Sequence, residues 1–201
     1  MIKIAITGSL ASGKTTASRI LSIRRGPLFS ADKAVKQLYR NKHFKFLVRR
    51  KFKIKTNNQL KKSLKKLILK NKNNIKKLER IIHPLVRKKM KNFTSQNKNK
   101  KLLFYEIPLL IESKLIKYFN VVIFIKAKKQ LRLKRFQSKG GDKKLFNLLN
   151  NKQMNDMKKI GFCDHVVVNE KNLNILKKNL LVIISKYEWS FLRYRNHRII
   201  F

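Results

Sequence analysis

The residues best suited to chemistry lie near the start of the chain, where glycines are followed by a lysine and a threonine. The segment GSLASGKT at residues 8–15 matches the pattern GxxxxGK[ST] in full. Glycines in this pattern let backbone N–H groups fold around phosphate oxygens at the positive end of a helix. The lysine adds a point charge at the β- and γ-phosphates, and the threonine hydroxyl is a ligand for Mg²⁺. The segment therefore predicts a site for a nucleoside triphosphate.

A chance glycine turn is the alternative interpretation of this segment. The chain has only 6 glycines, and two of them occupy the required places between a predicted strand and a predicted helix. That context confirms a match of this kind. Lys14 is then a catalytic residue and Thr15 a ligand of Mg²⁺. We expect the nucleotide to contact Gly8, Ser9, Leu10, Ala11, Ser12, Gly13, Lys14, Thr15 and Thr16.

Two carboxylates at the ends of predicted strands could assist such a loop. Glu106 closes an apolar run, Leu102–Tyr105, and could orient Mg²⁺ through a water molecule. A buried strand that ends in a solvated glutamate would give the same pattern. Asp32 follows the second predicted strand, where a carboxylate can accept the proton of an attacking hydroxyl group. Aspartate is also a favoured helix N-cap, and the two roles can coexist.

These residues need a scaffold that brings the ends of several strands to one edge. Short apolar, β-branched runs alternate with helix-like segments, which predicts an α/β fold with a parallel five-stranded sheet flanked by helices. Right-handed crossovers and short links place the carboxyl ends of such strands on the edge where ligands bind. We expect the strands at residues 2–7, 27–29, 102–107, 121–125 and 165–168, and helices at 16–23 and 34–39.

Residues 41–100 have a different pattern, rich in lysine and poor in alternating β-branched residues. Apolar residues at spacings of three and four, as from Leu60 to Ile68, predict a mostly helical region. Proline disfavours helix at the residue before it, so Pro84 indicates a helix boundary at His83. The segment 92–101, rich in Asn and Lys, is expected to be an exposed loop.

The composition is dominated by positive charge. Lys and Arg number 52 against 9 Asp and Glu, which gives a formal net charge of +43. Such a field attracts polyanions, so nucleic acid must be considered as a partner. The basic residues are, however, spread from Lys3 to Arg198 and accompanied by many Asn and Ile, as a codon bias towards A and T would also produce. Charge alone therefore does not assign the function.

Length and hydropathy set further expectations. A chain of 201 residues with 43% hydrophobic residues is consistent with one folding unit. Its single cysteine cannot form an internal disulfide, and no Cys/His cluster has metal-ligand spacing. No run of 18 apolar residues and no signal-peptide pattern is seen, so we expect a cytoplasmic protein without membrane contact.

Four segments in order give the chain a family resemblance. After the phosphate-binding loop come FSAD at 29–32, IHPLVR at 82–87 and EIPLLIE at 106–112. This series resembles the dephospho-CoA kinase family over nearly the whole chain, and HPLVR paired with PLLIE is far more specific than the loop alone. The resemblance implies transfer of the γ-phosphate of ATP, with Mg²⁺, to the ribose 3′-hydroxyl of dephospho-CoA. The products would be coenzyme A and ADP.

The resemblance also implies roles for residues and regions. Residues 1–32, 101–131 and 154–201 would form the nucleotide-binding core, 33–100 the acceptor-binding region and 132–153 a lid. Asp32 would be the general base, and Arg135, together with Lys139, would reach the ATP phosphates from the lid. The acceptor would contact Asp32, His83, Pro84, Arg87, Pro108 and Leu109.

Two positions depart from the family pattern. Ser30 stands where the family usually has an aspartate, and Lys139 where it has an arginine, so the bidentate fork of a guanidinium is lost there. The alternatives that stay open are a nucleoside or nucleotide kinase, a nucleic-acid-binding ATPase, and a non-catalytic module that binds CoA or a nucleotide. We expect a monomer, with an oligomer as the alternative, and binding of nucleic acid only non-specifically, if at all.

Overall fold

The computed structural model describes residues 1–55, 60–71 and 73–196, with 189–196 described by their backbone alone. The chain divides into two compact units. Unit 1 comprises Met1–Phe29 and Asn97–Phe201, and unit 2 comprises Ser30–Gln96. Each unit is described by itself. Unit 2 begins at Ser30 and ends at Gln96, whereas the acceptor-binding region expected from the sequence spans residues 33–100.

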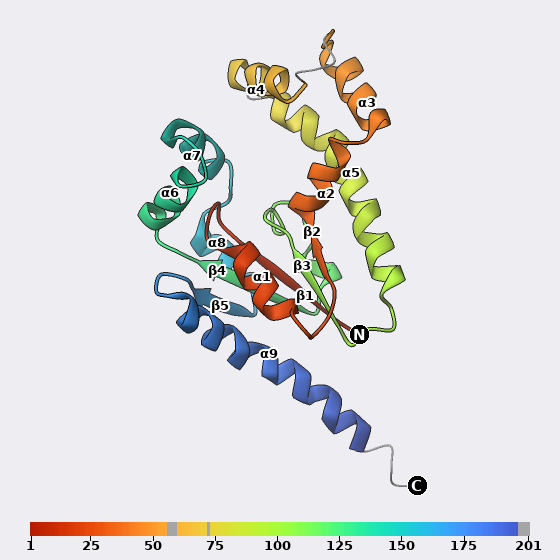
Figure 1. Cartoon of the computed structure of the whole chain (residues 1–201), viewed down its shortest axis with the longest axis vertical. Helices are drawn as coiled ribbons and strands as arrows, with labels where there is room; N and C mark the ends of the chain where they lie inside the picture. Colours follow the sequence, from red (N-terminus) through yellow and green to blue (C-terminus); the bar gives the residue numbers. More distant parts are fainter. Residues whose placement is uncertain (56–59, 72, 197–201) are drawn as a thin grey trace. The chain divides into compact units, whose positions relative to one another are not determined.

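A five-stranded sheet with the order β2-β3-β1-β4-β5 forms the centre of unit 1 (Figure 1). Strand β1 pairs in parallel with both β3 and β4, and β4 pairs in parallel with β5. The predicted parallel α/β fold is confirmed, and all five predicted strands are present. Their bounds are β1 Ile2–Gly8, β2 Leu28–Ser30, β3 Leu102–Glu106, β4 Val121–Lys126 and β5 His165–Val168.

Burial explains why these runs form strands. Each residue of β3 is buried, as are the first five residues of β4, which is the pattern of a strand covered on both faces. One apolar cluster joins β1, β3, β4 and β5 to Ala17 and Leu21 of helix α1 and to Leu176, Leu180 and Ile184 of helix α9. The helices of unit 1 are α1 Lys14–Ser22, η1 Ile116–Tyr118, α6 Lys129–Gln137, α7 Lys143–Asn150, α8 Asp156–Ile160 and α9 Leu173–Asn196.

Unit 2 is helical in the residues described, as the sequence predicts. Its helices are α2 Ala31–Leu38, α3 Lys42–Phe52, α4 Leu60–Lys70 and α5 Asn73–Gln96. Leucines at the predicted spacing, such as Leu60 and Leu64, are buried against Phe44 and Val48 of α3. The shared apolar cluster, rather than helix propensity, therefore stabilises these lysine-rich helices.

Helix α5 corrects two predictions. The boundary predicted at His83 is wrong, because α5 continues through Pro84. Proline removes one backbone hydrogen bond there, but the flanking Ile82 and Leu85 pack against the apolar cluster of unit 2 and hold the helix on both sides. The loop predicted at 92–101 is also wrong over its first half, because the helix extends to Gln96.

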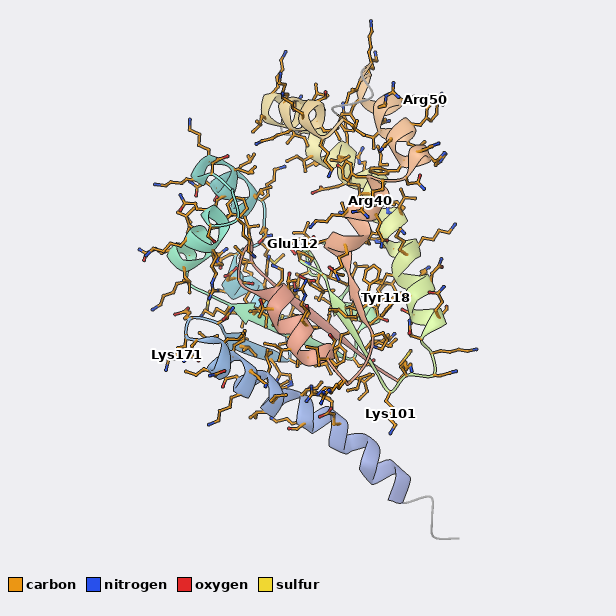
Figure 2. The ribbon with its side chains drawn as sticks, viewed as in Figure 1. Arg40, Arg50, Lys101, Glu112, Tyr118 and Lys171 are labelled. Atoms are coloured by element: carbon orange, nitrogen blue, oxygen red, sulfur yellow. The ribbon has the colours of Figure 1, made fainter. Side chains whose placement is uncertain are left out.

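The basic side chains extend into solvent over both units (Figure 2). Arg40 and Arg50 of unit 2 are at least partly exposed, as are Lys101 and Lys171 of unit 1. The charge is thus not gathered on a single element. In the part of the chain that the structure describes, no helix combines the length and the apolar character needed to cross a membrane.

Candidate active site

The phosphate-binding loop joins the central strand β1 to helix α1, in the predicted strand-loop-helix context. Gly8 has φ +147°, and a Cβ atom there would lie 2.4 Å from the carbonyl oxygen of Ile125. Gly13, the N-cap of α1, has φ +101°. Both φ values lie in the region that favours glycine, so these two residues allow the turn that leads from β1 into α1. A helix N-terminus in this setting favours an anion.

Lys14 is the first residue of α1 and is buried within the loop. The residue is 8% exposed, and Nζ donates a hydrogen bond of 2.8 Å to the carbonyl oxygen of Ser9. A buried ammonium group held in the bend of a glycine-rich loop is suited to bind phosphate oxygens. This position fits the role predicted for Lys14.

Thr15 and Glu106 form a pair of oxygen donors beside the loop. The Thr15 hydroxyl donates to Oε1 of Glu106, which ends β3 and is 2% exposed. The alternative of a solvated glutamate is therefore wrong. Mg²⁺ at phosphate sites is held by one or two protein oxygens together with phosphates and water. Among the described residues no group of three or more His, Cys, Asp or Glu could hold a metal ion. The Thr15–Glu106 pair offers the kind of oxygen donors that such a site uses, and binding of Mg²⁺ to it stays a prediction.

Arg135 lies against the second half of the loop. From helix α6 its Nη1 donates to the carbonyl oxygen of Ser12 at 3.4 Å, and its Nη2 to that of Asn169 at 3.1 Å. The side chain of Asn169, which follows β5, also donates to the Ser12 carbonyl at 2.8 Å. The guanidinium group thus lies next to the nucleotide loop. Its contact with ATP phosphates stays a prediction.

The first half of the loop is held by a different set of side chains. Oδ1 of Asp156 accepts the hydroxyl hydrogen of Ser9, and Oε1 of Gln153 accepts the backbone N–H of Leu10 at 3.1 Å. Nη1 of Arg132 donates to the carbonyl oxygen of Leu10 at 3.3 Å. Burial lowers the pKa of the Arg132 guanidinium, and Asp156 opposes that shift. Both halves of the loop are therefore braced by residues distant in sequence.

The predicted lid consists of α6, a glycine turn and α7. Lys139 is exposed in this turn, and Gly140 has φ +81° with open space, among the described residues, where a Cβ would lie. A Cβ at Gly141, in contrast, would overlap the ring of Phe136. Asp142 caps α7 by accepting from the N–H of Leu145 at 2.7 Å. The contact of Lys139 with ATP stays a prediction.

Pro108 and Leu109 follow β3 closely. The strand ends at Glu106, as expected for a chain that reaches a proline, and the Pro108 carbonyl accepts the hydroxyl of Thr7 at 3.3 Å. Pro108 and Leu109 are partly exposed, whereas the next two residues are buried. Thr7 immediately precedes the phosphate-binding loop, so the start of the predicted acceptor segment is tied to it within unit 1.

Asp32 and the other predicted acceptor residues belong to unit 2. Asp32 is exposed in the first turn of α2, and the N-cap is Ser30, whose side chain accepts from the N–H of Lys33 at 3.4 Å. The N-cap interpretation of Asp32 is therefore wrong, because Ser30 has the extended backbone of a cap. On α5, His83 is half-buried and Arg87 exposed, and their spacing of four places both on one face.

Unit 1 therefore brings together the loop, Thr15, Glu106, Arg135 and the Pro108–Leu109 segment. Asp32, His83, Pro84 and Arg87 lie in unit 2. Sequence reasoning missed the bracing roles of Arg132, Asp156 and Asn169. The pattern carried little signal for them, because an arginine on a basic helix and polar residues in turns are common on any surface.

Comparisons with known proteins agree over most of the chain. A family model described as dephospho-CoA kinase matches residues 2–174. The dephospho-CoA kinase of Bartonella quintana is 33% identical over 187 residues, which cover 90% of this chain and 96% of that one. The dephospho-CoA kinase of Rickettsia bellii is 30% identical over 190 residues, which cover 94% of this chain and 98% of that one.

Solved structures extend this likeness to three dimensions. The dephospho-CoA kinase of Campylobacter jejuni has a TM-score of 0.64 at 26% identity, covering 92% of this chain and 96% of that one. A Thermus thermophilus protein has a TM-score of 0.77 at 25% identity, with coverage of 92% and 97%. The shikimate kinase of Bacteroides thetaiotaomicron, 10% identical with a TM-score of 0.56, shares the fold alone.

Proposed function

Because this chain belongs to the dephospho-CoA kinase family, we propose that it transfers the γ-phosphate of ATP to the ribose 3′-hydroxyl of dephospho-CoA. The products are coenzyme A and ADP, which makes this the last step of coenzyme A biosynthesis. The observation that carries the proposal is the glycine-bounded loop, with Lys14 buried inside it and the Thr15–Glu106 pair beside it. That arrangement is built for a nucleoside triphosphate.

The residues of unit 1 supply positioning and electrostatic stabilisation of the transferred group. The amides at the start of α1 and the Lys14 ammonium group neutralise charge on the β- and γ-phosphates. Arg135, already beside Ser12, is the lid residue that adds a second cation, and Lys139 is an additional one. Excluding water from the phosphates is the task of the lid, because water would otherwise compete as acceptor.

Asp32 is the general base of the proposed reaction. It accepts the proton of the 3′-hydroxyl as the O3′–P bond forms and the bond from the γ-phosphorus to the β,γ-bridging oxygen breaks. Its exposed position in the first turn of α2, with the cap role filled by Ser30, suits the carboxylate to this task. The residues that we assign to acceptor binding, from the family resemblance, are His83, Pro84 and Arg87 in unit 2 and Pro108 and Leu109 in unit 1.

Mg²⁺ is the metal that the site residues fit. The Thr15 hydroxyl would bind it directly and Glu106 through a water molecule. Bound there, Mg²⁺ would supply positive charge that stabilises the negative charge developing on the phosphates during transfer. We further propose a cytoplasmic enzyme that acts as a monomer on small-molecule substrates.

The test is a reaction of the purified protein with ATP, Mg²⁺ and dephospho-CoA, in which ADP and coenzyme A are followed by mass. We expect coenzyme A from the wild type and a loss of about 10²–10⁴-fold in kcat for Asp32→Asn, the range for removal of a general base. Asp164→Asn is the matched control. Asp164 accepts from the N–H of Val122 at the start of β4, away from the phosphate-binding loop, and asparagine keeps an oxygen acceptor there.

Each outcome has a definite meaning. If the wild type forms no coenzyme A but phosphorylates a nucleoside, the substrate is wrong and the scaffold serves a nucleoside kinase. If ATP hydrolysis requires added DNA or RNA, the protein is a nucleic-acid ATPase. If Asp32→Asn turns over as fast as the wild type, the kinase stands and Asp32 is not its base.

A further inference from the structure

The Ser9–Leu10 half of the phosphate-binding loop is held from outside by a turn and two helices distant in sequence. We call Arg132, Gln153 and Asp156 the brace. Arg132 lies on α6, Gln153 precedes α8, and Asp156 is the first residue of α8. Helix α8 contacts β4 in unit 1. The brace and the loop therefore belong to one unit.

Each backbone polar atom of Leu10 and the side chain of Ser9 has a partner in the brace. Gln153 accepts the Leu10 N–H at 3.1 Å, and Arg132 donates to the Leu10 carbonyl at 3.3 Å. Asp156 accepts the Ser9 hydroxyl hydrogen. The brace makes its hydrogen bonds to Ser9 and Leu10 only. It therefore holds this half of the loop without occupying the N–H groups at the start of α1.

The Ser9 contact leads directly to the catalytic lysine. Asp156 holds the hydroxyl of Ser9. The carbonyl oxygen of Ser9 accepts hydrogen bonds from Lys14 Nζ at 2.8 Å and from the N–H of Ser12 at 3.1 Å. A shift of Ser9 therefore moves the acceptor that orients the buried ammonium group. Asp156 does not need to touch the nucleotide to influence the position of Lys14.

The brace is itself anchored. Arg132 is 5% exposed, and its guanidinium donates to the carbonyl of Ala127 at 3.1 Å and to Oδ1 of Asn150 at 2.8 Å. Its Nη2 lies 4.0 Å from Oδ2 of Asp156, so the carboxylate is held between Ser9 and a buried cation. One turn along α8, Lys159 forms an ion pair with Glu112. The Asp156 carboxylate therefore has few alternative positions.

We propose that Asp156, with Arg132 and Gln153, is a positioning residue of the kinase, which holds Ser9 so that Lys14 is oriented for the triphosphate. The inference rests on the proposed function only as far as nucleotide binding. A purely structural role would lower the stability of the fold without changing nucleotide affinity. A positioning role lowers affinity for ATP, and it does so through Ser9.

The experiment measures ATP·Mg²⁺ binding by titration calorimetry with no acceptor present. We expect Asp156→Ala and Ser9→Ala each to weaken binding about tenfold, the size of one hydrogen bond to a charged group. The double variant should also be about tenfold weaker and not a hundredfold, because both changes remove the same contact. In turnover, KM for ATP should rise while KM for dephospho-CoA stays at the wild-type value.

Two further variants make the test decisive. Glu188→Gln, which removes the partly exposed ion pair of 2.9 Å with Arg25, is the matched control for loss of an acidic partner and should bind ATP as the wild type does. Asp156→Asn keeps an oxygen acceptor for Ser9 and should recover most of the affinity. If Asp156→Ala does not fold, Ser9→Ala and Asp156→Asn still carry the comparison.

Additive losses in the double variant would overturn the route through Ser9. Unchanged affinity in Asp156→Ala, with only a lower melting temperature, would reduce Asp156 to a structural role. A wild type that binds ATP but forms no coenzyme A would refute the proposed substrate and leave this inference intact. A wild type that does not bind ATP would overturn both.

Discussion

Nζ of Lys159 lies 2.7 Å from Oε1 of Glu112, and the Lys159 side chain is fully buried. The same Glu112 oxygen accepts the N–H of Met154 at 3.1 Å. The pair joins the segment after β3 to helix α8. A charge taken out of water in this way is tolerated only while its partner is present.

Removing one member of this pair is therefore expected to destabilise the fold. We predict that Glu112→Gln lowers the free energy of unfolding by about 3 kcal/mol, because the Lys159 ammonium group is left buried without its counter-charge. The double variant Glu112→Gln with Lys159→Met should recover a large part of that loss. Urea unfolding of the wild type, the single variant and the double variant at the same neutral pH measures these differences. A double variant less stable than the single one would contradict the explanation.

Gly13 is expected to be irreplaceable for a steric reason in addition to its backbone conformation. A Cβ atom at residue 13 would lie 2.1 Å from Nδ2 of Asn169. We predict that Gly13→Ala displaces the Asn169 amide from Ser12 and weakens ATP binding at least about tenfold, as for loss of a buried hydrogen bond next to the phosphates. Binding is measured by titration calorimetry.

Gly140→Ala distinguishes the two effects of an alanine at residue 13, which are an unfavourable left-handed backbone and a steric clash with Asn169. Gly140 has φ +81°, but among the described residues no atom lies within 4 Å of an added Cβ. Its melting temperature therefore reports the cost of a left-handed backbone without a clash. If Gly13→Ala is no less stable than Gly140→Ala, the clash with Asn169 is not the controlling effect.

The Thr15 hydroxyl is expected to control the response to metal. We predict that Thr15→Val, which keeps the shape but lacks the oxygen ligand, raises the Mg²⁺ concentration for half-maximal turnover about tenfold or more. Thr15→Ser retains the hydroxyl and should behave as the wild type does. A Mg²⁺ titration of turnover, with ATP binding measured with and without the ion, makes the comparison. Equal Mg²⁺ requirements in the Val and Ser variants would remove Thr15 as a ligand.

His165 is expected to make the folded protein less stable as the pH falls. Burial lowers the pKa of this imidazole below its ordinary value, and the charge of Lys186 adds to the effect while Asp164 opposes it. Nε2 of the neutral ring lies 2.6 Å from the hydroxyl oxygen of Tyr187. The unfolded chain then binds the proton more readily than the folded one, so stability is present above the unfolded pKa and decreases as pH falls below it.

The measurement is the urea midpoint at about pH 7.5 and about pH 5.5, on either side of the ordinary histidine pKa, for the wild type and for His165→Phe. The wild type should lose stability between the two values, whereas the variant, which has no titrating group at this position, should lose less. Equal losses in both proteins would assign the acid sensitivity to other residues.

The sequence predicted the sheet well because its central strands are buried on both faces. Runs such as Val121–Ile125 are continuous in apolar residues, so each can be recognised as a strand without knowledge of the strands that pair with it. The phosphate-binding loop was predictable for a related reason, since its glycines satisfy a local backbone requirement. Both features are visible within a few residues of chain.

What the sequence did not reveal depends on contacts made over long distances. Pro84 lies inside a helix because apolar packing on both sides of it outweighs a local preference. Asp156 meets Ser9 across a separation of 147 residues, and Asn169 meets Ser12 across 157. No periodicity encodes such pairings. Neither do the residue types, which are those of ordinary turns.

The central position of β1 has a consequence for how the protein is made. Ile2 pairs with Leu102 and Ile4 with Val121, so β1 leaves the ribosome about a hundred residues before the strands that pair with it. At about 5–20 residues per second, an apolar strand waits several seconds without its sheet. We therefore expect the nascent chain to depend on chaperones that shield this segment, and truncated products to aggregate.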